Sequence, residues 1–98
     1  MANPFPTDTE MAVLHMLQSE RDGLYGLEIV KASNGKLKRG SIYVVLSRLQ
    51  DKGFVSAEVR RDAGHAGLPR PRYKLTPVGE RVVKHADLMR LHDDGAYA

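Results

Sequence analysis

Residues 39–60 read RGSIYVVLSRLQDKGFVSAEVR, and this stretch decides the fold. Its first half predicts a helix from near Arg39 to Gly53, because apolar side chains recur at helical spacing at Ile42, Val45, Leu46 and Leu49. From Phe54 to Arg60 the apolar residues alternate with polar ones, which predicts a strand. The helix has a second face that is polar and basic, formed by Arg39, Tyr43, Ser47, Arg48 and Lys52. We therefore expect it to pack on a core and to present its basic side outward.

Two shorter helices are predicted before this stretch. Thr7 and Glu10 have the spacing of a capping box, so a helix is expected from there to about residue 20. A second helix is expected from about residue 26 to residue 33, with Leu24 and Tyr25 leading into it. Asn34-Gly35 ends this helix, because these residues adopt the left-handed conformation readily.

The residues after the stretch predict a hairpin and a last helix. Glycines and a proline between Arg61 and Arg70 predict a loop, and residues 72–75 predict a returning strand. Thr76-Pro77 begins a helix that is expected to reach about Leu91, before Asp93-Asp94-Gly95 ends it. The predicted class is mainly α with a small β-hairpin. Three helices, two strands and a closing helix, in this order, are typical of a winged helix-turn-helix.

The amino-acid composition excludes several classes of protein. The chain has 98 residues, enough for one domain, and its lack of cysteine excludes a disulfide framework, thiol catalysis and cysteine-ligated zinc. No apolar run approaches the roughly 18 residues of a membrane span, so no membrane association is predicted. The N-terminal residues have neither the charge nor the apolar run of a signal peptide, and we expect a cytoplasmic protein.

Charge is segregated along the chain. Residues 31–74 contain eleven Lys or Arg and three Asp or Glu, whereas residues 1–30 contain one and five. So large a local excess of positive charge is self-repelling unless a polyanion neutralises it. Double-stranded DNA is the predicted partner. The alternative is that this chain is an interaction module that uses the same charges to bind another regulator.

The predicted fold indicates how DNA would be bound. The major groove, about 12 Å wide, admits one helix, and the helix that begins at Arg39 offers its basic face for this purpose. Backbone donors near Gly40 and Ser41 are expected to bind a phosphate. The hairpin tip adds cationic residues expected to contact DNA at Arg60, Arg61, Arg70 and Arg72. Tyr43 has two open roles, since its hydroxyl can bind a phosphate and its ring can pack at the edge of the core. Residues 1–76 are the predicted DNA-binding domain.

Several short runs resemble the PadR-like transcriptional regulators. They are Tyr25-Gly26-Leu27-Glu28-Ile29, Gly40-Ser41-Ile42-Tyr43 with Leu46, Arg48 and Leu49, Gly53-Phe54-Val55, and Pro71-Arg72-Tyr73-Lys74-Leu75-Thr76 with Gly79. The resemblance covers about residues 11–82. It implies a homodimeric repressor of an inverted-repeat operator, with DNA contacts at Ser41, Tyr43, Ser47 and Arg48. Where the family commonly has a serine or threonine cap, this chain has Lys38, which makes the helix start less well capped and adds a cation that we count among the DNA contacts.

The same resemblance implies that the last helix and the partner's first helix form the dimer interface. Residues 77–98 are accordingly predicted to be a dimerisation helix with a frayed tail, in one compact unit with the rest. Surplus apolar residues at both ends of the chain agree with this, unless they pack within one subunit. The predicted interface residues are Met11, Leu14, Val78, Val82, Ala86 and Met89. A small-molecule effector in the dimer groove stays an open alternative without support, because the chain has no tryptophan to clamp a flat ligand.

No catalytic residues, metal ligands or cofactor are predicted. Ser41 and His15 lack the glycine-flanked nucleophile turn of a hydrolase. His85 and His92 are seven residues apart, which on a helix places them about 10 Å apart along the axis, too far to share one ion.

Overall fold

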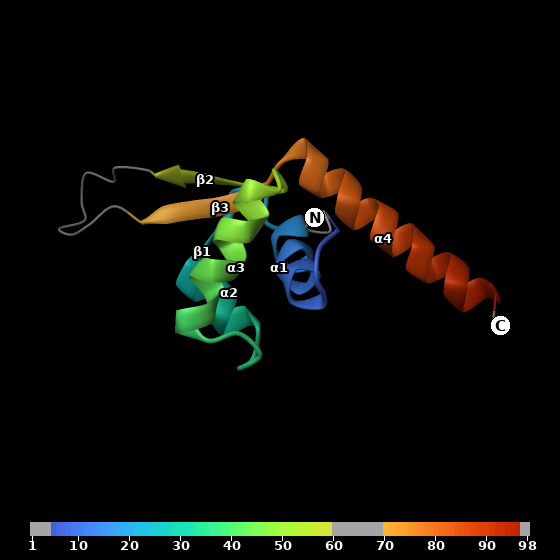
Figure 1. Ribbon diagram of the computed structural model, residues 1–98, viewed down its shortest axis with the longest axis horizontal. Coiled ribbons are helices and arrows are strands. Elements are labelled where there is room, and N and C mark those ends of the chain that lie inside the picture. The colour runs from blue at the N-terminus through green and yellow to red at the C-terminus, as the bar shows by residue number, and fades with distance from the viewer. Residues whose placement is uncertain (1–4, 60–69, 97–98) are drawn as a thin grey trace.

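The computed structural model of the chain describes residues 5–59 and 70–96, with side chains as far as residue 89. The elements, in order, are α1 (Asp8–Gln18), β1 (Leu24–Tyr25), α2 (Gly26–Ala32), α3 (Arg39–Asp51), β2 (Val55–Val59), β3 (Pro71–Leu75) and α4 (Pro77–Ala96). The fold is mainly helical with a small antiparallel sheet, which confirms the predicted winged helix-turn-helix (Figure 1). None of the helices in the described part of the chain is long and apolar enough to cross a membrane.

Local signals define the ends of the first two helices, as predicted. The Thr7 hydroxyl accepts a hydrogen bond from the Glu10 backbone at 3.2 Å, and the Thr7 backbone donates to the Glu10 carboxylate at 2.9 Å. This capping box satisfies donors that the first turn of α1 leaves unpaired. Asn34 and Gly35 follow α2 with φ angles of 54° and 88°, so the left-handed stop is also confirmed.

The sheet has one strand more than the sequence predicted. The strand order is β1-β3-β2, and β2 pairs with β3 from Val55↔Leu75 to Val59↔Pro71. β1 pairs with the other edge of β3 through Leu24↔Tyr73 and Tyr25↔Arg72. A strand of two residues is too short to show alternation, which is why these residues were expected only to lead into the following helix. The loop predicted between the two hairpin strands lies outside the described residues, except for Arg70.

The core lies between the first three helices and the sheet. The predicted apolar face of α3 is buried in it. The buried hydrophobic residues are Val13, Leu14, Leu17, Ile29, Leu37, Ile42, Val45, Leu46, Leu49, Phe54, Val55, Tyr73 and Val83. Burial raises the pKa of the Tyr73 hydroxyl, and the neighbouring Tyr43 adds to the effect. Among the described side chains of α4, Val83 belongs to this set and Val82 packs against it partly buried.

The start of α4 is fastened to the end of α3. The Thr76 hydroxyl accepts a hydrogen bond from the Gly79 backbone at 3.0 Å and donates to the Gly53 carbonyl at 2.6 Å. A Cβ atom at Gly79 would overlap the Phe54 carbonyl oxygen, so glycine is required for this close approach. The cap predicted at Thr76 is therefore confirmed, and it also joins two elements.

The end of α4 differs from the prediction. The helix runs through Asp93-Asp94-Gly95 to Ala96, where a stop near Leu91 was expected. One glycine lowers helix stability by only about 1 kcal/mol relative to alanine, which is not enough to end a helix by itself. Figure 1 shows α4 leaving the body of the molecule as a long rod.

Candidate nucleic-acid interface

The outer face of α3 is open to solvent. Arg39, Ser41, Ser47 and Arg48 are exposed, and the Tyr43 side chain is 49% exposed. All five were predicted to contact DNA, and the structure brings them together on one helix of 13 residues. At 1.5 Å per residue the helix is about 20 Å long, which suits a groove that admits one helix.

Tyr43 has a structural contact as well as an exposed surface. A Cβ atom built on Gly26 would lie 3.0 Å from Tyr43 Cε1 and 3.2 Å from its hydroxyl oxygen, so the ring rests on the first residue of α2. Of the two roles left open by the sequence, the structure shows the packing one, because one side of the ring packs on α2; binding of a phosphate by the hydroxyl stays a prediction. This contact helps to fix the angle at which α3 leaves the core.

The N-terminus of α3 is cationic and has no side-chain cap. Lys38 occupies the N-cap position and makes no capping hydrogen bond, as its side chain predicted. Lys36, Lys38 and Arg39 are all exposed around this end of the helix. The Ser41 backbone donor, expected to bind a phosphate, instead donates to the Lys38 carbonyl at 3.0 Å. The positive charge at this end of the helix is therefore carried by exposed side chains.

Arg72, on the second strand of the hairpin that forms the wing, interacts with other residues of the same chain. Its guanidinium carbon lies 4.8 Å from the centre of the Tyr25 ring, and Nη1 donates to the Asp22 carbonyl at 3.5 Å. Such a cation–π contact holds the side chain against β1. The DNA contact expected at Arg72 stays a prediction, and in this conformation the side chain already has partners within the protein. Arg70 is exposed, and Arg60 and Arg61 lie outside the described residues.

Two further bases of the cationic segment form ion pairs. Lys74 Nζ lies 3.4 Å from the Glu58 carboxylate, and Lys52 Nζ lies 2.6 Å from Glu10 Oε1. Lys52, expected on the outer face of α3, is therefore half-buried and directed toward α1. The bases that remain exposed and make no ion pair within the described residues are Lys31, Lys36, Lys38, Arg39, Arg48 and Arg70.

Glu10 is a buried carboxylate, with a side chain only 2% exposed. Burial raises the pKa of Glu10, but hydrogen bonds from Lys52 and the Thr7 backbone, with the charges of Lys52 and Arg48, outweigh it. The pKa of this carboxyl group therefore lies below its ordinary value. Glu10 is ionised at neutral pH and holds Lys52 in place.

The sequence prediction missed Val44. This side chain is 51% exposed and lies on the outer face of α3, opposite the buried residues. The signal was available, because Val44 is out of phase with the apolar face of the helix.

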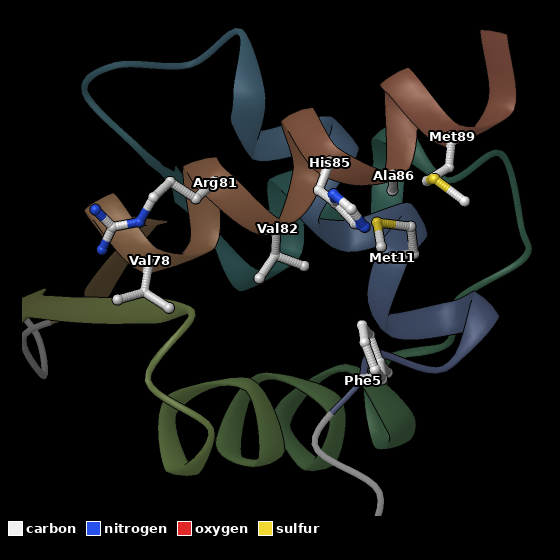
Figure 2. Close-up of a pocket in the computed structure, with 8 residues that line it drawn as sticks. All are labelled: Phe5, Met11, Val78, Arg81, Val82, His85, Ala86 and Met89. Atoms are coloured by element: carbon white, nitrogen blue, oxygen red, sulfur yellow. The ribbon is translucent and has the colours of Figure 1, made fainter. Parts of the chain in front are cut away.

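A groove of about 600 Å³ lies between α4 and the N-terminal part of the chain (Figure 2). Its lining includes five of the six predicted dimer residues: Met11, Val78, Val82, Ala86 and Met89. Phe5, Arg81 and His85 complete it. Leu14, the sixth, is fully buried in the core of its own protomer and offers no surface to a partner, so its assignment to the interface is corrected.

α1 and α4 are also joined by polar contacts at Asp87. His15 Nε2 lies 3.6 Å from one Asp87 carboxylate oxygen, and Gln18 donates to the other at 3.4 Å. In the described part of the chain, no three His, Cys, Asp or Glu residues are grouped so as to hold a metal ion.

Comparison with solved structures supports the fold. A PadR-like transcription factor from Bacteroides fragilis is 26% identical with a TM-score of 0.71, over 91% of this chain and 87% of that one. A PadR family regulator from Clostridium difficile is 22% identical with a TM-score of 0.73, over 89% and 91%, and at this identity it supports the fold alone. Bacillus subtilis PadR, solved in complex with operator DNA, is 25% identical with a TM-score of 0.65, over 80% of this chain and 45% of that one.

Comparison with sequences gives the family. A search of curated protein sequences found no match. The model of the PadR-like family of transcriptional regulators, by contrast, matches residues 13–85, which include α2, the whole of α3 and four of the eight residues that line the groove. The protein therefore belongs to the PadR-like family of transcriptional regulators.

Proposed function

We propose that the protein is a homodimeric repressor that binds an inverted-repeat operator with α3 in the major groove. The observation that carries the proposal is the outer face of α3, where Arg39 and Arg48 are exposed and make no ion pair within the described residues. Guanidinium groups in this position are suited to base edges and phosphates. Ser41, Tyr43 and Ser47 add hydroxyl groups, and Lys38 and Arg70 add positive charge at the sides.

The similarity to Bacillus subtilis PadR supports DNA as the partner, since that protein was solved with operator DNA. The wing is proposed to lie over the DNA backbone, with Arg70 as its described contact and Arg60 and Arg61 as contacts beyond the described residues. Arg72 is left out of the proposed contacts, because Tyr25 and Asp22 hold it.

A second copy of the chain is the proposed occupant of the groove on α4. Five apolar or small side chains predicted for the interface line it: Met11, Val78, Val82, Ala86 and Met89. Val78 and Met89 are 43% and 50% exposed in the single protomer, which is unfavourable for side chains of this type in water. A twofold axis beside α4 lets each protomer cover the other's groove. The dimer would act in the cytoplasm by occupying the operator.

The experiment is a selection of bound duplexes from a random library at low salt. We expect enriched sequences with two half-sites about 34 Å apart, one helical turn, in inverted orientation. Neutralisation of six to eight phosphates predicts a log–log salt slope of about −5 to −7. Repression is tested by placing the enriched site in a promoter, where added protein should reduce transcription in vitro. Failure to enrich any duplex at low salt would reject the proposal.

Variants separate sequence reading from charge. Arg48→Ala should reduce the preference for the enriched sequence over random duplex, because a base contact is lost. Lys84→Ala, an exposed cation on α4, is the control and should leave both affinities unchanged. If Arg48→Ala weakens enriched and random duplexes equally, Arg48 does not read the sequence.

A further inference from the structure

We propose that Val44 is a specificity-determining residue that reads the C5 methyl group of a thymine in the major groove. The inference deepens the proposed function and rests on it, since it presupposes that α3 lies in the groove. It adds the chemical class of base that one side chain selects.

The first observation that supports the inference is the position of Val44 on α3. The four buried residues of the helix, Ile42, Val45, Leu46 and Leu49, lie on one side, and at 100° per residue Val44 points to the other. Its side chain is 51% exposed, slightly more than that of Tyr43. Figure 2 places the apolar groove on α4, whose lining does not include Val44, so the two surfaces are separate.

An exposed valine at this position is not explained by the fold. Valine is a weaker helix former than alanine, lysine or glutamate, because its branched side chain is restricted in a helix. About half of its surface stays exposed in the described protomer, and the nearby side chains of Ser41, Ser47 and Arg48 on the outer face are polar or charged. A stiff, branched apolar group in a cationic surface is suited to a partner that is anionic but has apolar groups within it.

Duplex DNA has such a group in the major groove. The C5 methyl of thymine is the apolar feature of the groove, and cytosine lacks it. Valine forms no hydrogen bonds with base edges, so its contact favours thymine over cytosine by the methyl group alone. Arg39 and Arg48 on the same helix are available for phosphates and guanine edges.

The residues one turn away leave room for this contact. Gly40 precedes Val44 by four positions, and a Cβ atom built there would meet no atom within 4 Å. Ser47 follows by three positions and is small. The backbone of α3 can therefore come close enough to the groove floor for the short valine side chain to reach a methyl group. Longer side chains at these two positions would hold the helix away.

The test replaces thymine by deoxyuridine, which lacks only the methyl group. Duplexes selected for binding are remade with one substitution at a time, and affinity is measured by fluorescence anisotropy. For the unaltered protein we expect about a fourfold loss at one thymine in each half-site, which corresponds to about 0.8 kcal/mol for one buried methyl group. Val44→Ala should bind the thymine duplex less tightly and lose most of this discrimination.

Two further variants make the test specific. Val59→Ala changes a valine that is 56% exposed but lies on β2, and it should keep the full ratio between thymine and uracil duplexes. Gly40→Ala should not lower the melting temperature, because the new methyl group meets no protein atom and alanine favours the helix, yet it should weaken binding at least fourfold.

The outcomes distinguish the two proposals. If duplexes are bound but no uracil substitution weakens binding, or if Val44→Ala shows the same ratio as the unaltered protein, the inference about Val44 is wrong and DNA binding stands. If no duplex is bound at all, the proposed function fails and the inference fails with it.

Discussion

Lys52, the residue that follows α3, donates to Glu10 at the start of α1 across 2.6 Å. Its Nζ also donates to the Phe5 carbonyl at 3.3 Å. One ammonium group therefore joins the end of the proposed DNA-reading helix to the N-terminal segment whose Phe5 side chain lines the groove on α4. The Glu10 carboxylate of this ion pair is almost fully buried. Loss of Lys52 would therefore leave a buried charge without a counter-charge.

Replacement of Lys52 should therefore cost stability. We expect Lys52→Met to lower the free energy of unfolding by about 2–3 kcal/mol, because Glu10 keeps its burial and loses its counter-charge. Urea denaturation followed by circular dichroism measures this change. Lys31→Met is the matched control on α2: Lys31 is exposed, and its replacement should change stability by less than about 0.5 kcal/mol. Equal effects of the two variants would contradict the structural role of Lys52.

The same carboxylate predicts a pH dependence. The pKa of Glu10 is lowered in the folded protein from an ordinary value of 4.5, so its ionised form favours folding. This contribution is fully present above pH 4.5 and is lost as the pH falls through the lower pKa of the folded state. The free energy of unfolding should decrease more steeply below pH 4.5 for the unaltered protein than for Glu10→Gln. Parallel curves for the two proteins would show that Glu10 does not contribute in this way.

The proposed dimer is tested by adjacent residues of α4. Met89 lines the groove and is 50% exposed, whereas Leu88 is 65% exposed and is not among the lining residues. Met89→Glu should convert the dimer to monomer at micromolar concentration, because a carboxylate would be buried in the interface. Leu88→Glu introduces the same charge next to it and should leave the dimer intact. Sedimentation equilibrium gives both masses, and a monomeric unaltered protein would reject the proposed interface.

Two arginines of the hairpin should behave differently. Arg70 is exposed, so Arg70→Ala should weaken enriched and random duplexes alike by several-fold and reduce the salt slope by about 1. Arg72 is stacked on Tyr25, so Arg72→Ala should instead lower the free energy of unfolding by about 1 kcal/mol. Anisotropy titrations and urea denaturation, applied to both variants, separate the two effects. If Arg72→Ala lowers DNA affinity and leaves stability unchanged, Arg72 contacts DNA and its stacking on Tyr25 does not stabilise the fold.

Most of the fold was predictable because it depends on short-range signals. The spacing of Ile42, Val45, Leu46 and Leu49 identified α3 and its buried face, and Thr7 with Glu10 identified the start of α1. β1 was not predictable in this way. Leu24 and Tyr25 form a strand because β3 lies beside them, and nothing in two residues alone indicates that partner.

The candidate site was less predictable, because charge says nothing about which partner a side chain finds. Nothing in the sequence distinguishes the basic residues Lys52, Arg72 and Arg48 from one another. In the structure, however, Lys52 pairs with a buried carboxylate and Arg72 stacks on an aromatic ring. Both partners come from segments remote in the chain. The same limit explains Leu14, whose apolar character suited an interface as well as the core that contains it.

The Thr76 hydroxyl donates to the Gly53 carbonyl after α3 and accepts from the Gly79 backbone in the first turn of α4, so it links the two helices directly. In a dimer assembled through α4, a change in the tilt between the paired rods would swing both α3 helices through the same angle. The spacing between operator halves would then be set at the far side of the molecule, by the angle at which two copies meet.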